Sequence, residues 1–135
     1  MQKSIHILLI EDDPDDVELL QTALEDEGVI FESSVIAHGD QVIPYLKMGK
    51  NLPTIIVLDL NIPKTHGKEV LLQLKASAKF SHIPVVILTT SSARAEREFC
   101  LEAGAAAFMI KPVTMSEFKD IVRNIREVID QGLTP

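Results

Sequence analysis

The chain of 135 residues has the length of one domain, since domains usually contain ~100–200 residues. Its 46% hydrophobic content is typical of a globular protein, and its single cysteine, Cys100, excludes an internal disulfide framework. A formal net charge of −7 makes nucleic acid and anionic membrane surfaces unexpected partners. No apolar run approaches the ~20 residues of a membrane span. We therefore expect a cytoplasmic domain.

Five short segments have the composition of β-strands. Four of them are apolar runs rich in Ile and Val that lack alternation, which is typical of strands buried on both faces of a parallel sheet. These four runs are residues 5–10, 55–58, 85–88 and 105–110. Residues 31–37 also contain polar side chains and predict an edge strand.

Helical patterns follow each of these strands. The first helix is expected to begin at Pro14 with Asp13 as its N-cap, and the last is predicted from a capping box, Thr114 with Glu117. The other helices are expected over residues 40–48, after Gly67 and over residues 93–103. Glycines are expected to end four of the five helices: Gly28, Gly49, Gly104 and Gly132. Strands and helices that alternate in this way predict a doubly wound α/β domain with a parallel sheet.

Polar residues close the four apolar strands at their carboxyl ends, which is where ligands bind in open α/β sheets. They bring carboxylates, hydroxyls and one ammonium group to a single edge of the sheet: Glu11, Asp12 and Asp13; Asp59; Thr89 and Thr90; and Lys111. Oxygen ligands without His or Cys favour a hard cation such as Mg²⁺. Together with a lysine and a hydroxyl, such a cation can bind a phosphoryl group.

Asp59 is the best candidate for a carboxylate nucleophile, because it closes a central strand and stands alone. Any one of the polar residues could instead serve as a turn or cap residue, and Asp13 before Pro14 is better explained as a cap. The combination of Asp59 with Asp12, Thr89 and Lys111 on four strand ends favours a functional site.

The chain resembles the receiver domain of two-component response regulators along nearly its whole length. The matching segments agree in order and spacing, and they are residues 7–13, 57–63 with Gly67, 87–90 and 103–112. Residues 59–70 and 88–92 are most similar to the single-domain regulators that are paired with bacterial phytochromes. The resemblance implies a flavodoxin-like (βα)5 fold with strand order 2-1-3-4-5. It also implies a single receiver domain over residues 1–135, without an output domain.

The resemblance implies that Asp59 accepts a phosphoryl group from a sensor histidine kinase, for which a phytochrome-type kinase is a candidate. Mg²⁺ would be bound by Asp12, by Asp59 and by the backbone carbonyl of Asn61. Glu11 would act through metal-bound water, and Lys111 would pair with the phosphoryl group.

A switch in surface structure is also implied. Thr89 would hydrogen-bond a phosphoryl oxygen and shift toward it, and Phe108 would then move inward and alter the surface of the fourth helix, fifth strand and fifth helix. Thr90 and Ser91 could tune how water reaches the aspartyl phosphate. The peptide bond before Pro112 would be cis. The altered surface would act on a downstream protein or through a homodimer.

Other functions have to be weighed against a receiver. An aspartate-nucleophile phosphatase usually needs a second Asp two residues after the nucleophile, where Asn61 stands, so we expect only self-catalysed phosphorylation and dephosphorylation and no turnover enzyme. A flavodoxin-like FMN binder would need a phosphate-binding loop after the first strand, where Glu11, Asp12 and Asp13 would repel phosphate. A phosphorelay intermediate and a degenerate receiver used as a phosphorylation-independent interaction module stay open.

Overall fold

The computed structural model describes residues 4–49 and 51–133, and this part of the chain contains one sheet of five parallel strands in the order β2-β1-β3-β4-β5. The strands are β1 (Ile5–Ile10), β2 (Phe31–Ile36), β3 (Ile55–Leu58), β4 (Val85–Thr89) and β5 (Ala107–Ile110). The predicted fold class, the strand order and the position of β2 at an edge are confirmed.

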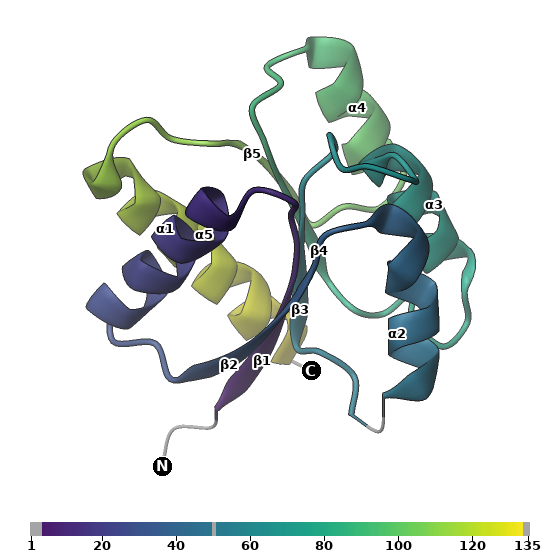
Figure 1. Cartoon of the computed structure of the whole chain (residues 1–135), viewed down its shortest axis with the longest axis horizontal. Helices are drawn as coiled ribbons and strands as arrows, with labels where there is room; N and C mark the ends of the chain where they lie inside the picture. Colours follow the sequence, from purple (N-terminus) through teal and green to yellow (C-terminus); the bar gives the residue numbers. More distant parts are fainter. Residues whose placement is uncertain (1–3, 50, 134–135) are drawn as a thin grey trace.

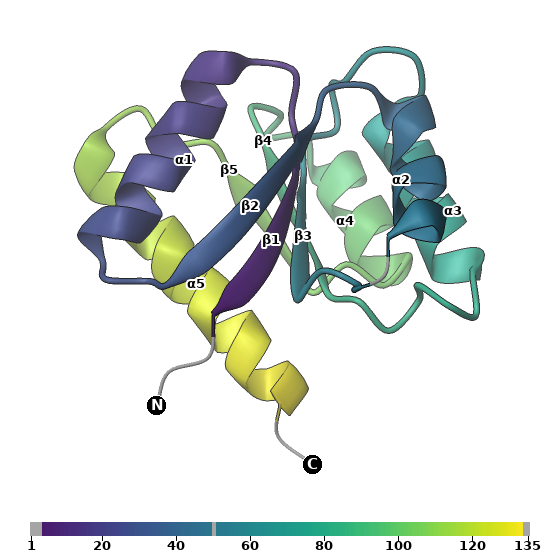
Figure 2. The ribbon, with the colours of Figure 1, turned by 60° about the horizontal axis from the view of Figure 1, so that its bottom comes forward.

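Helices cover both faces of the sheet (Figures 1 and 2). On one face lie α1 (Pro14–Asp26) and α5 (Met115–Leu133). On the other face lie α2 (Val42–Met48), α3 (Gly67–Ala76) and α4 (Arg94–Glu102), with a short 3-10 turn, η1 (Gly39–Gln41), before α2. None of the helices in residues 4–49 and 51–133 combines the length and the apolar character that crossing a membrane requires.

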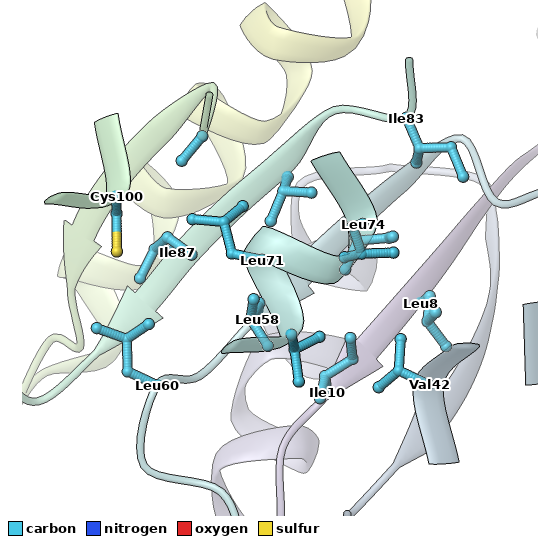
Figure 3. Packing of buried hydrophobic residues seen from close by; sticks show 14 of the residues in the cluster. Leu8, Ile10, Val42, Leu58, Leu60, Leu71, Leu74, Ile83, Ile87 and Cys100 are labelled. Carbon is cyan, nitrogen blue, oxygen red and sulfur yellow. The ribbon is translucent and has the colours of Figure 1, made fainter. Parts of the chain in front are cut away.

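The apolar strands lack alternation because each contributes to two hydrophobic clusters. Leu8 and Ile10 of β1 pack toward α2, α3 and α4, whereas Ile7 and Leu9 pack toward α1 and α5. Figure 3 shows Leu8 and Ile10 close to Val42 of α2. Burial on both faces thus explains why β1, β3 and β4 are largely apolar, with His6 in β1 and the terminal Thr89 of β4 as the polar residues.

The helix ends follow the local signals with some exceptions. Asp13 caps α1, since its Oδ1 accepts the N–H of Asp15 at 2.9 Å, and Gly28 has a φ of 74° just beyond this helix. The expectation that Gly132 ends α5 is wrong. Gly132 lies within α5, which continues to Leu133, and it does not have the positive φ that Gly28 and Gly104 have among the described glycines.

The pairing of the strands positions the polar strand ends. Ile10 of β1 lies opposite Leu58 of β3, and the N–H of Asp59 donates to the carbonyl of Ile10 at 3.0 Å. At the other side of β4, the N–H of Lys111 donates to the carbonyl of Thr89 at 2.7 Å. The residues that follow β1, β3, β4 and β5 therefore meet at one edge of the sheet.

Candidate functional site

The centre of the site is the ammonium group of Lys111, which contacts three carboxylates. Its Nζ lies 2.9 Å from Glu11 Oε2, 2.9 Å from Asp59 Oδ2 and 2.7 Å from Asp16 Oδ2. The side chain of Lys111 is only 11% exposed. An ammonium group has three N–H donors, so all three are directed at carboxylates.

Asp59 is nearly buried, with 6% of its surface exposed, and both of its carboxylate oxygens have partners. Oδ2 accepts from Lys111, and Oδ1 accepts the backbone N–H of Asn61 at 3.2 Å. Burial alone would raise the pKa of Asp59, but hydrogen bonds with Glu11, Lys111 and Asn61 outweigh it and hold the pKa below its usual value. Asp59 is therefore an anionic side chain at neutral pH.

Glu11 differs from Asp59 in its protonation. Burial, together with a hydrogen bond to Asp59 and repulsion by it, raises the pKa of Glu11 to about 7, although Lys111 acts in the opposite direction. Lys111 itself would lose basicity by burial, but hydrogen bonds with Asp16, Asp59 and Glu11 raise its pKa above the usual value. The site thus holds a cationic lysine, an anionic Asp59 and a Glu11 that titrates near neutral pH.

An acidic group at this edge has the composition of a divalent cation site. Carboxylate oxygens of Glu11, Asp12 and Asp59 all lie within 4.8 Å of one another. Asp12 is exposed and the other two side chains are largely covered, so a cation bound here would face solvent on one side. Such an oxygen-only donor set suits Mg²⁺, which keeps several of its waters. The participation of the Asn61 carbonyl stays a prediction.

Thr89, Thr90 and Ser91 lie at the carboxyl end of β4. Thr89 is completely buried and its Oγ1 accepts the N–H of Ser91 at 3.3 Å. The Ser91 hydroxyl in turn accepts the N–H of Ala93 at 3.3 Å, while Thr90 is exposed. These bonds form the turn that leads from β4 into α4, so a shift of the Thr89 hydroxyl would disturb the start of that helix.

Phe108 of β5 is already in an inward position. Its side chain is 8% exposed and belongs to the cluster between the sheet and α2, α3 and α4. The movement of Phe108 on phosphorylation that the family resemblance implied stays a prediction. On the outside, Arg97 Nη1 of α4 lies 3.5 Å from the carbonyl of Phe108 and links α4 to β5.

The expected cis peptide bond before Pro112 is wrong. All peptide bonds in residues 4–49 and 51–133 are trans, including the one between Lys111 and Pro112. The trans form of an X–Pro bond is favoured by ~0.5–1 kcal/mol. In this trans arrangement the Lys111 ammonium still reaches all three of its carboxylate partners.

Asp16 belongs to the site, although its role was missed in the sequence. It lies in the first turn of α1 and makes the shortest of the three contacts with Lys111. A signal was present, because Asp16 precedes the buried Leu20 by four residues and therefore lies on the inner face of the helix. A carboxylate on an inner helix face needs a partner.

Comparison with known proteins adds independent information. A family model described as the response regulator receiver domain matches residues 7–123. The chain is similar to "Probable methanogenesis regulatory protein FilR2" of Methanothrix harundinacea, with 34% identity over 125 residues that cover 90% of this chain and 81% of FilR2. This chain spans about half the length of two other curated relatives, covering 53% of one and 47% of the other.

Two solved structures share the fold over almost the whole chain. The phosphorylated cyanobacterial phytochrome response regulator RcpA has a TM-score of 0.86 and 31% identity, with 98% of both chains covered. The Mn²⁺-bound form of response regulator Rcp1 has a TM-score of 0.81 and 30% identity, with 91% of this chain and 92% of Rcp1 covered.

Proposed function

The chain belongs to the response regulator receiver-domain family of two-component signalling, and on this premise we propose that Asp59 accepts a phosphoryl group from a histidine kinase in a Mg²⁺-dependent reaction. The observation that carries the proposal is the position of the Asp59 carboxylate. It lies 2.9 Å from the Lys111 ammonium and within 4.8 Å of the other two carboxylates of the candidate cation site.

The protonation states support Asp59 as the nucleophile. Its lowered pKa keeps the carboxylate anionic, so that an oxygen can attack the phosphorus of the donor while the bond from phosphorus to the donor is broken. Lys111 stays protonated. One of its N–H groups can therefore exchange its hydrogen bond with Asp59 for a hydrogen bond with an oxygen of the incoming phosphoryl group. A cation held by Glu11, Asp12 and Asp59 would neutralise charge on the phosphoryl oxygens when bound. The Mn²⁺-bound form of Rcp1 supports a divalent ion here.

Phosphorylation would be read out at the surface of α4, β5 and α5. Thr89 would turn its hydroxyl toward the phosphoryl group. Its oxygen would then no longer accept the hydrogen bond from the N–H of Ser91, and this hydrogen bond begins the turn into α4. The same surface carries exposed apolar side chains, Ile110 at 51% and Val113 at 92%. These side chains suit contact with a downstream protein or with a second copy of the chain.

The likeness to RcpA supports a phytochrome-type kinase as the phosphoryl donor. The domain would act in the cytoplasm and catalyse only its own phosphorylation and dephosphorylation. A phosphorelay intermediate would use the same site and differ only in passing the phosphoryl group on. A degenerate receiver would use the fold for contacts alone.

Intact-protein mass tests the proposal. The chain is incubated with acetyl phosphate or with a phytochrome-type histidine kinase, with and without Mg²⁺, beside Asp59→Asn and Asp13→Asn. Asp13→Asn is a matched control, because it removes a carboxylate at the same edge and keeps an oxygen for capping α1. We expect one Mg²⁺-dependent phosphoryl adduct on the unchanged chain and on Asp13→Asn, and none on Asp59→Asn. An adduct that persists in Asp59→Asn, or no adduct from either donor, contradicts the proposal.

A further inference from the structure

We infer that Asp16 is a positioning residue for phosphoryl transfer, which anchors the Lys111 ammonium while its other two carboxylate partners engage the cation and the phosphoryl group. The inference rests on the proposed function and adds a residue of α1 to that site. Asp16 and Lys111 are 95 positions apart in the chain, and their side chains meet at 2.7 Å.

The surroundings of Lys111 leave it few alternatives to its carboxylate partners. A cavity of about 20 Å³ is bounded by Lys111 together with Glu11, Asp16 and Asp59. The rest of its lining is apolar and includes Leu20 of α1, Leu88 of β4 and Phe118 of α5. Since apolar side chains cannot accept a hydrogen bond, an ammonium that loses a carboxylate partner on this side is left unsatisfied.

Asp16 differs from the other two partners in what else it can bind. Glu11 and Asp59 belong to the acidic group that can hold a cation, and in the described part of the chain this group is completed by Asp12 and excludes Asp16. A cation bound by Glu11 and Asp59 would compete with Lys111 for their oxygens. Phosphorylation would then occupy an oxygen of Asp59. Asp16 therefore holds Lys111 through a contact that neither event removes.

The backbone at Asp16 is also held firmly in place by the fold. It lies in the first turn of α1, two residues after Pro14 and three after the Asp13 cap, and its side chain is 30% exposed. A helix of 13 residues that packs against α5 and the sheet holds this turn in place. With one donor fixed by Asp16, the Lys111 ammonium can turn a second donor from Asp59 to the phosphoryl group without leaving the site.

The test compares Asp16→Asn with Asp15→Asn. The two substitutions remove the same charge from the same helical turn, but Asp15 is exposed and its backbone N–H, rather than its side chain, makes the capping bond. We expect the rate of phosphorylation by acetyl phosphate at saturating Mg²⁺ to fall about tenfold in Asp16→Asn, less than the ~10²–10³-fold typical of removing a stabilising donor itself. Asp15→Asn should stay within about twofold of the unchanged chain, and Asp16→Glu should recover most of the rate.

A second measurement follows Lys111 without any phosphorylation. Trace labelling by acetic anhydride modifies only the neutral amine, so the rate at Lys111 reports how firmly its partners hold the proton. We expect faster labelling of Lys111 in Asp16→Asn and no change in Asp15→Asn. If Asp16 had only a structural role, Asp16→Asn would lower the unfolding midpoint without changing the rate at which Lys111 is labelled.

The outcomes separate the two proposals. If the unchanged chain takes up no phosphoryl group, the proposed function fails and the role of Asp16 in transfer fails with it. If the unchanged chain is phosphorylated and the Asp16→Asn and Asp15→Asn rates are equal, only the inference about Asp16 is overturned. Equal labelling of Lys111 in the two variants overturns it as well.

Discussion

Glu11 and Asp59 lie side by side because Ile10 pairs with Leu58 in the sheet, and both carboxylates bind the same Lys111 nitrogen at 2.9 Å. One ammonium therefore offsets the charge of neighbouring, largely covered carboxylates. This balance of charge changes when a carboxylate takes up a proton, when a cation binds or when Lys111 is replaced.

Replacing the lysine should destabilise the domain most at alkaline pH. In Lys111→Met the apolar stem is kept, but the carboxylates of Glu11, Asp16 and Asp59 lose their shared cation. We expect the free energy of unfolding to fall by about 3 kcal/mol at pH 8, the cost of breaking a buried ion pair. The loss should be smaller at pH 5, where the carboxylates can take up protons, and Mg²⁺ should recover part of it at pH 8.

Urea unfolding at both pH values, with and without Mg²⁺, measures this effect. Lys119→Met is the matched control, because Lys119 is an exposed lysine of α5. An equal loss at pH 5 and pH 8 would show that charge balance is not the cause.

The affinity for Mg²⁺ should rise with pH. The pKa of Glu11 is raised to about 7, so below this pH the carboxyl carries a proton that competes with a cation. Affinity should be about tenfold lower at pH 6 than at pH 8, since one proton is displaced per ion. Titration calorimetry at the two pH values measures the change. In Glu11→Gln the affinity should be weak and should lose this pH dependence; a retained tenfold change would assign it to another group.

Without Mg²⁺, stability should fall as pH rises from 5 to 8. A group whose pKa is raised by folding contributes stability that is present below its ordinary value, here 4.5, and lost as pH passes the folded value of about 7. The lowered pKa of Asp59 acts only at more acidic pH, and the raised pKa of Lys111 only at more alkaline pH. The difference in unfolding free energy between the unchanged chain and Glu11→Gln isolates the effect. If that difference is constant from pH 5 to pH 8, Glu11 does not titrate in this range.

Gly67 should not tolerate alanine. A Cβ atom there would lie 2.5 Å from the carbonyl oxygen of Asp59 and 2.5 Å from the Cα of Leu60, which are backbone atoms that cannot turn away. We expect Gly67→Ala to lower the free energy of unfolding by about 2 kcal/mol or more and to slow phosphorylation of Asp59, because overpacking displaces the backbone. Thermal unfolding and the phosphorylation rate measure both effects.

Gly132→Ala is the control for that substitution. A Cβ at Gly132 has no atom within 4 Å among those outside its own helix turn, and the residue is helical. The Gly132→Ala substitution should therefore leave the free energy of unfolding unchanged or raise it by up to ~1 kcal/mol. Equal effects of the two alanine substitutions would contradict the close packing at Gly67.

The amino-acid sequence by itself predicted the strands, the sheet edge and most of the site. Short apolar runs that lack alternation, such as residues 55–58, are typical of strands covered on both faces, and parallel strands deliver the residues after their carboxyl ends to one edge. For this reason Asp59 and Lys111 could be placed together although 52 positions separate them. Local periodicity and chain direction suffice for such conclusions.

Tertiary structure alone decided how the side chains at this edge share their partners. Which face of α1 meets the end of β5 depends on how the helix is rotated against the sheet, and this rotation joins Asp16 to Lys111. The inward position of Phe108 likewise depends on the side chains that pack around it. The physical reason is that a residue's pattern determines whether it is covered, whereas its partner is determined by distances of a few ångströms between elements that are remote in the chain.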